Sequence, residues 1–165
     1  MRTFACLLVF LAFSQSLYAQ DELQENSYWS AGLKAGYAQG VQVAHQWNGP
    51  AGILLELTSR GKEGAFLSSF HYQRHESIAE LFGVEAGDFT WYWSAGLHLG
   101  NYSKLLERAG GKFGLGPNFG GGIQYRFASF PFVVGMHYRL VVDFNLDTGN
   151  NALFNDPGIS IRYTF

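Results

Sequence analysis

The sequence predicts an all-β fold, namely an eight-stranded antiparallel up-and-down transmembrane β-barrel. The final segment, Ile159 to Phe165, alternates strictly between apolar and polar residues, so a strand formed by it has one apolar and one polar face. Phe165 ends the chain directly after this segment, which is the usual last-strand signature of outer-membrane barrels. Aromatic residues make up 17% of the chain, which suits the aromatic girdles that such barrels have at both membrane interfaces. Glycine occurs 21 times, which suits the strongly bent strands of a small barrel.

The start of the chain predicts export. Arg2 precedes an apolar run from Phe4 to Phe13, and small residues follow up to Ala19, which is the pattern of a secretory signal peptide. An apolar run of about ten residues is too short to cross a bilayer as a helix. Cleavage near Ala19 also removes Cys6, the one cysteine of the chain. The expected organisation is a signal peptide at 1–19, a polar lead-in at 20–27 and the barrel at 28–165.

Composition limits the partners and the way in which the chain can meet a membrane. The formal net charge is −2, so no basic surplus indicates nucleic acid. After the signal no apolar run reaches eighteen residues, so a membrane span must come from strands. The expected partners are outer-membrane lipid and lipopolysaccharide together with the barrel assembly machinery, which reads Tyr163 and Phe165. We expect a monomer without a cofactor.

Eight segments are predicted as strands, and most are about nine to twelve residues long, as a tilted membrane strand needs. Eight is the smallest even number that closes a barrel filled by side chains. The four prolines are expected between strands or at a strand start, where a missing amide hydrogen does no harm. They are Pro50, Pro117, Pro131 and Pro157. The predicted strands are 28–38, 40–47, 51–60, 64–75, 89–100, 118–127, 132–144 and 157–165.

The alternation predicts which face meets lipid. In segment 89–100, Trp91, Trp93 and Leu97 share one face, while Ser94 and His98 share the other. A soluble barrel would turn the apolar face inward. Rings of that size on every strand would overfill so narrow a lumen, whereas the small and polar residues would fit. We therefore expect the apolar faces to contact lipid and the polar faces to line the lumen.

Connection lengths predict the orientation, because outer-membrane barrels keep short turns and both termini on the periplasmic side. The periplasmic turns are expected at 48–50, 76–88 and 128–131. The outer loops are expected near 39 and at 61–63, 101–117 and 145–156.

Four segments carry a resemblance to a known group of proteins. They are Gly32–Gly36, Trp91–Gly100, Gly122–Phe127 with the following Pro131, and Ile159–Phe165. In this order they resemble the small eight-stranded outer-membrane β-barrel proteins common in Bacteroidota. The resemblance implies a fold and a location. It brings no established catalytic residues to this chain.

The motifs that could carry chemistry fit a structural role better than a catalytic one. His71 and His75 lie about 13 Å apart on a strand at roughly 3.3 Å per residue, so they cannot share a metal ion. No predicted strand contains the His-x-Ser spacing of lipid A deacylases, since the segment 64–75 ends at His75 and Ser77 lies beyond it. His98 and His137 fall on the lumen face. The glycine-rich stretch 110–122 lacks the Lys-Ser/Thr pair of a phosphate-binding loop. We expect no catalytic residues, no metal site and no enzymatic activity.

Charged residues on the lumen face form the main candidate site. Buried charges must be paired or hydrated, and cations outnumber carboxylates in this set. Glu56 is expected to be ionised and held by at least one arginine in a two-bond fork. The network would close the lumen, either as a purely structural plug or as part of an ion path. The predicted members are Lys34, Glu56, Arg126, Arg139, Asp143 and Arg162, with Arg60, His71, His98 and His137 as further candidates.

Three classes of function remain open from the sequence. The first is a structural or interaction barrel that presents loops at the cell surface. The second is a narrow channel or small-ligand carrier, and the third is a lipid A-modifying enzyme. A soluble, lipocalin-like carrier would need the opposite polarity of the two faces.

Overall fold

The computed structural model describes residues 27–61, 64–84, 86–102, 113–146 and 151–165. The predicted signal peptide at 1–19 and nearly all of the lead-in lie outside these ranges. Most described residues belong to strands, and no helix among them is long and apolar enough to cross a membrane.

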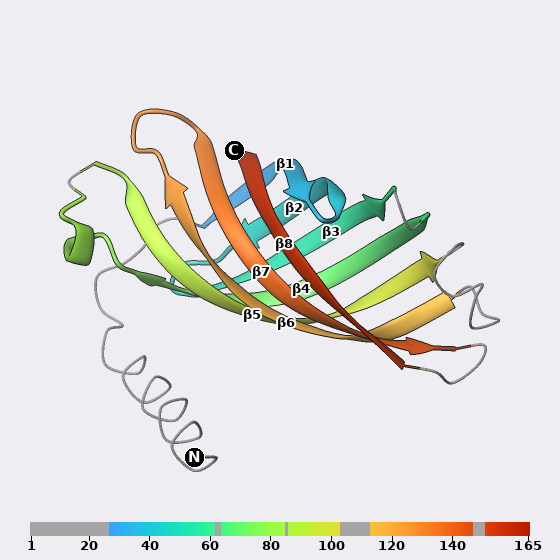
Figure 1. Cartoon of the computed structure of the whole chain (residues 1–165). Helices are drawn as coiled ribbons and strands as arrows, with labels where there is room; N and C mark the ends of the chain where they lie inside the picture. The colour runs from blue at the N-terminus through green and yellow to red at the C-terminus, as the bar shows by residue number, and fades with distance from the viewer. Residues whose placement is uncertain (1–26, 62–63, 85, 103–112, 147–150) are drawn as a thin grey trace, which may run out of the picture.

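Eight strands form one closed antiparallel barrel, as the sequence predicts. Each strand pairs with its neighbours in chain order, and β1 pairs with β8 to close the ring (Figure 1). Period-two alternation produces this fold because every strand can then present one face to the lumen and one to the outside. The strands are β1 (Tyr28–Gly36), β2 (Gln39–Gln46), β3 (Ala51–Arg60), β4 (Ala65–Ser77), β5 (Asp88–Tyr102), β6 (Phe113–Arg126), β7 (Phe132–Asn145) and β8 (Asn151–Thr164).

Two strand starts and two prolines were predicted wrongly. β6 begins at Phe113 and β8 at Asn151, so Pro117 and Pro157 lie within strands. Pro117 pairs with Leu97 of β5, but the register between β6 and β7 omits Gly116 and Pro117. Pro157 lies one residue beyond the last position of β8 that pairs with β1. In both places the proline faces a gap in one ladder, so its missing amide hydrogen leaves no partner unsatisfied.

The two rims of the barrel differ. At one rim β8 meets β1, where Trp29 and Phe165 exchange two backbone hydrogen bonds of 3.2 and 2.9 Å. This rim also carries the connections 47–50, 78–87 and 127–131, of which the second contains the short 3-10 helix η1 (Glu80–Phe82). The opposite rim carries the connection 37–38 and the ends of β3, β5 and β7 at Arg60, Tyr102 and Asn145.

The polarity of the barrel is inverted relative to a soluble protein, as the alternation predicts. Leu97 and Met136 are 59% and 57% exposed on the outer face, whereas Ser94 and His137 are 3% and 6% exposed. Polar and charged side chains outnumber apolar ones among the buried residues of the described ranges. The hydrophobic surface of this protein is therefore its outside, and the lumen is a polar interior.

Candidate functional site

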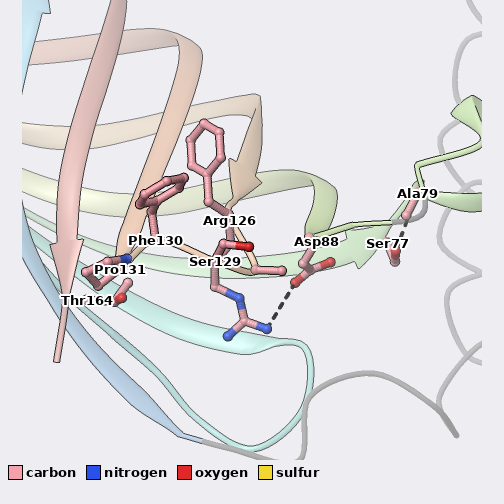
Figure 2. A pocket seen from close by; sticks show the side chains of 11 residues that line it. Ser77, Ala79, Asp88, Arg126, Ser129, Phe130, Pro131 and Thr164 are labelled. Atoms are coloured by element: carbon pink, nitrogen blue, oxygen red, sulfur yellow. Dashed lines mark hydrogen bonds and ion pairs between the residues drawn. The ribbon is translucent and has the colours of Figure 1, made fainter.

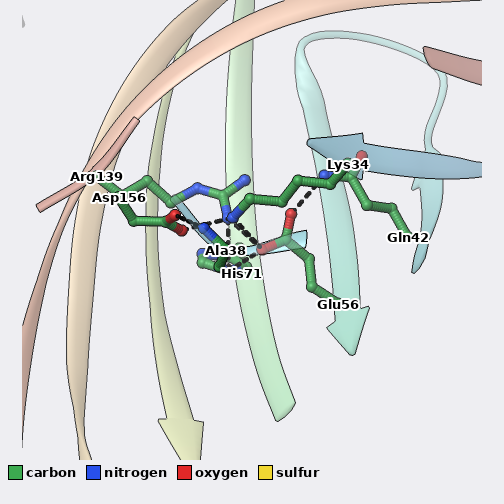
Figure 3. A network of polar contacts seen from close by, with 7 residues as sticks. All are labelled: Lys34, Ala38, Gln42, Glu56, His71, Arg139 and Asp156. Carbon is green, nitrogen blue, oxygen red and sulfur yellow. Dashed lines mark hydrogen bonds and ion pairs between the residues drawn. The ribbon is translucent and has the colours of Figure 1, made fainter. Parts of the chain in front are cut away.

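The centre of the lumen contains a cluster of charged side chains that we call the central network. It consists of Lys34 from β1, Glu56 from β3, His71 from β4, Arg139 from β7 and Asp156 from β8 (Figure 3). Strands β3 and β7 stand four places apart in a ring of eight, so the network joins opposite walls. A lumen of eight strands is narrow enough for side chains to do this.

Glu56 is the hub of the central network. One carboxylate oxygen, Oε2, accepts a hydrogen bond from Nη1 of Arg139 and lies 3.6 Å from Nζ of Lys34 and 3.5 Å from Nε2 of His71. The other oxygen, Oε1, accepts a 2.6 Å hydrogen bond from Gln42. Arg139 thus reaches the carboxylate through one nitrogen and one oxygen, and not through the expected two-bond fork. Glu56 is 3% exposed, so this contact is shielded from water.

Asp156 balances the network, although it was not among the predicted members. Nζ of Lys34 donates a 2.5 Å hydrogen bond to Oδ2 of Asp156, and the backbone nitrogen of Ala38 donates to Oδ1 at 3.3 Å. The centre therefore holds two cations and two carboxylates, so Glu56 is not the sole counter-ion of several cations. The alternation of β8 could have placed Asp156 in the lumen, because its face continues that of Arg162. Because the predicted strand began at Pro157, Asp156 was assigned to a loop and not to the lumen face.

Glycines of β6 make room for polar side chains of β7. A Cβ atom added at Gly120 would collide with the side chain of Arg139, its partner in β7, and with the backbone oxygen of Tyr138, each at 2.5 Å. The same holds at Gly114, where an added Cβ would overlap the carboxylate of Asp143. Glycine on the lumen face of β6 thus allows long polar side chains of β7 to cross over this strand.

Arg126 does not belong to the central network, contrary to the prediction. It is the last residue of β6 and lies at the rim where the chain ends, 3.8 Å from Asp88 and with its guanidinium over the ring of Tyr28. It lines an open hollow of about 650 Å³ together with Ser77 and Thr164 (Figure 2). Alternation defines the face on which Arg126 lies but not its height along the barrel axis, which explains the error.

Asp143 and Arg162 are buried in the lumen but lie apart from the centre. Asp143 is near the end of β7 at the rim opposite the chain end, and one of its carboxylate oxygens is 3.7 Å from Nε2 of His98. Arg162 is near the other end of the barrel and donates a 2.7 Å hydrogen bond to Gln124. Of the six predicted members, the structure brings Lys34 and Arg139 into contact with Glu56.

The further candidates also occupy different heights. His71 joins the centre, whereas Arg60 is buried near the rim opposite the chain end, with its guanidinium 4.8 Å from the ring centroids of both Tyr37 and Phe154. His98 and His137 are buried on the lumen side, where a lipid on the outer face does not reach them. Within the described ranges no group of three or more His, Cys, Asp or Glu side chains is arranged to hold a metal ion.

Comparison with solved structures finds bacterial proteins, one of them a β-barrel domain and one an outer membrane protein. The N-terminal β-barrel domain of Pseudomonas aeruginosa OprF superimposes with a TM-score of 0.57 at 17% identity, covering 86% of this chain and 98% of the OprF chain. The Yersinia pestis outer membrane protein Ail, determined in a phospholipid bilayer nanodisc, gives a TM-score of 0.48 at 18% identity, covering 84% of this chain and 98% of Ail.

Sequence comparison identifies no relative. No protein-family model matches the chain, and no curated protein sequence matches it either. At 17% identity the likeness to the OprF barrel shows a shared fold. The resemblance to Bacteroidota barrels stays a prediction.

Proposed function

We propose that this chain is a small outer-membrane β-barrel with a structural or interaction role, loops at the cell surface and a lumen closed by the central network. The observation that carries the proposal is the inverted polarity of the barrel. An outer surface on which Leu97 and Met136 are more than half exposed is unsuited to water. It suits the hydrocarbon core of a bilayer, where closed barrels satisfy every backbone hydrogen bond internally.

Aromatic side chains near both rims support a membrane position. At the rim where the chain ends, Trp29 and Tyr163 are 45% and 50% exposed, and Tyr163 makes an edge contact with Phe132. Near the opposite rim Tyr37 and Phe144 are 45% and 44% exposed. Rings of amphipathic aromatics at two levels fit the two interfaces of a bilayer.

The central network supports a closed lumen. Lys34 and Glu56 have side chains that are at most 2% exposed, and together with Arg139 they connect β1, β3 and β7 across the interior. An ion that passes this level must separate buried charge pairs, which is costly in a medium of low dielectric constant. The network therefore favours a plug over a steady channel.

Membrane insertion is tested by expression in a Gram-negative host. The protein is expected in the outer-membrane fraction, with a folded band that shifts on gels only after boiling. It is also expected to need detergent to remain monodisperse. A protein that stays monodisperse and folded without detergent would contradict the proposal and favour the soluble carrier.

Planar-bilayer recordings test the plug. The parent protein is expected to be closed, and Glu56→Ala is expected to open conducting events because Arg139 loses its carboxylate partner. Asp88→Ala is the matched control, since Asp88 contacts Arg126 at the rim and not in the centre. Steady conductance of the parent would contradict the plug and favour the narrow channel.

A further inference from the structure

Arg162 is a buried cation beside which the described part of the chain places no carboxylate. Its residue exposure is 6%, and its hydrogen bond goes to the neutral amide oxygen of Gln124 at 2.7 Å. Among the described residues no carboxylate oxygen lies within 4 Å of its guanidinium, while its Nε is buried without a partner. The carboxylates of Glu56 and Asp156 are already held by Lys34 and Arg139.

This situation differs from that of Asp143, another buried charge of the lumen. One carboxylate oxygen of Asp143 lies 3.7 Å from Nε2 of His98. Arg162 has no ionisable partner at such a distance among the described residues, and a guanidinium stays charged in proteins. A buried charge without a partner costs several kcal/mol, so a compensating negative charge at Arg162 would be strongly stabilising.

The side chains around Arg162 are suited to donate hydrogen bonds to an anion. Gln124 receives the bond from Arg162 and lies 3.2 Å from Nδ1 of His75 through its own amide nitrogen. Thr90 stands opposite Gln124 in the β5–β6 ladder. Within the described part of the chain, the Thr90 hydroxyl and Nε2 of His75 are buried and have no hydrogen-bond partner. Gly32 of β1 pairs with Arg162, and Ser30 lies two residues before Gly32 on the same strand. The Ser30 hydroxyl is also buried without a hydrogen-bond partner among the described residues.

We propose that Arg162 is the centre of a binding site for a small monovalent inorganic anion of halide type, with hydrogen bonds from Thr90, His75 and Ser30. The ligand is monovalent because a single guanidinium carries the charge of the site. Val133 of β7 pairs with Arg162 on one side and with Arg126 on the other. Arg126 lines the open hollow at the rim, so an anion arriving from that side first meets another guanidinium (Figure 2). The site depends on the barrel fold and not on the membrane location.

Bromide is a suitable probe, and unfolding of the full mature chain in zwitterionic micelles is a suitable readout. Sodium bromide replaces sodium gluconate at constant ionic strength, so that screening stays the same. Above the dissociation constant, each tenfold increase in bromide should raise the folding equilibrium constant of the parent about tenfold. Arg162→Gln should lose this dependence. Arg126→Gln should keep it, because it removes a guanidinium at the rim and leaves the site in place.

A second variant keeps the test decisive if Arg162→Gln fails to fold. Gln124→Glu changes little in shape but places a carboxylate within hydrogen-bond distance of Arg162, which supplies the counter-ion from the protein. This variant should be more stable than the parent in gluconate and should no longer respond to bromide. A parent without any bromide response, or a full response in Gln124→Glu or Arg162→Gln, would overturn the proposal.

Discussion

Substitution of Glu56 by glutamine is expected to destabilise the barrel strongly. Glutamine has nearly the same volume, so the change removes a charge without opening a cavity. Arg139 then stays buried without a carboxylate, whereas Lys34 keeps its 2.5 Å hydrogen bond to Asp156. One cation is thus left uncompensated. The side chains of Glu56 and Arg139 are each 2% exposed, so the appropriate cost is that of breaking a buried pair, about 3–5 kcal/mol.

Urea unfolding in phospholipid bilayers, followed by the fluorescence of the four tryptophans, measures this cost. Asp88→Asn is the matched control. It removes one carboxylate from a pair with Arg126 at 3.8 Å whose side chains are 14% and 32% exposed. Solvent screens such a pair, so the control should cost at most about 1 kcal/mol.

A double-mutant cycle with Arg139→Gln isolates the interaction. Once Glu56→Gln has been made, removing Arg139 also removes the unpaired charge. The two substitutions together should therefore cost less than the sum of the single ones, by up to about 3 kcal/mol. Two results together would refute the reasoning. The free energy of unfolding of Glu56→Gln would lie within about 1 kcal/mol of the parent, and the effects of the two single substitutions would add up to that of the double variant. Such results would mean that water fills the lumen at the level of Glu56.

Two further predictions concern the outer surface of the barrel and the junction between β1 and the end of the chain. Leu97→Arg should lower the free energy of unfolding in bilayers by about 2–4 kcal/mol. The control Leu81→Arg, on the exposed 3-10 helix at the rim, should change the free energy of unfolding by no more than about 0.5 kcal/mol. Equal effects of the two substitutions would contradict the membrane position of Leu97. Deletion of Phe165 should slow assembly and weaken the heat-modifiable band, because it removes both an aromatic ring and two backbone hydrogen bonds to Trp29. Phe165→Ala keeps those backbone hydrogen bonds but removes the aromatic ring. An assembly defect of Phe165→Ala as large as that of the deletion would therefore assign the effect to the ring. Normal assembly of both variants would contradict a role of Phe165 in assembly.

The number of strands and the face of each residue could be predicted from the sequence, because period-two alternation records them directly. Ser94 and His98 are buried and Leu97 is exposed, as their positions in segment 89–100 require. The strand starts at Phe113 and Asn151 could not be found in the same way. Proline normally marks a strand boundary, and only the gaps in the ladders at Pro117 and Pro157 make it acceptable inside these strands.

The partners within the lumen were less predictable than its lining. Alternation does not give the height of a residue along the axis, which also depends on strand tilt and on the stagger between strands. Arg126 and Arg139 share the lumen face predicted for them, yet only Arg139 contacts Glu56. Contacts across the lumen, such as the one between β3 and β7, belong to no ladder, so strand pairing alone would not have revealed them.

The central claim is that the apolar face of every strand contacts lipid while the polar face lines a closed lumen. The predicted removal of Cys6 with the signal peptide leaves a mature chain without cysteine, so single cysteines can be introduced one at a time along β5 from residue 93 to residue 99. Gly96 is left out, because an added Cβ atom would lie 2.0 Å from the backbone oxygen of Phe70. Spin labels on these variants in bilayers report access to oxygen, which dissolves in lipid, and to a water-soluble nickel complex. We expect a period of two, with high oxygen access at Trp93, Ala95, Leu97 and Leu99 and low access to both reagents at the positions between them. Higher nickel access than oxygen access at the four outer positions would contradict the claim.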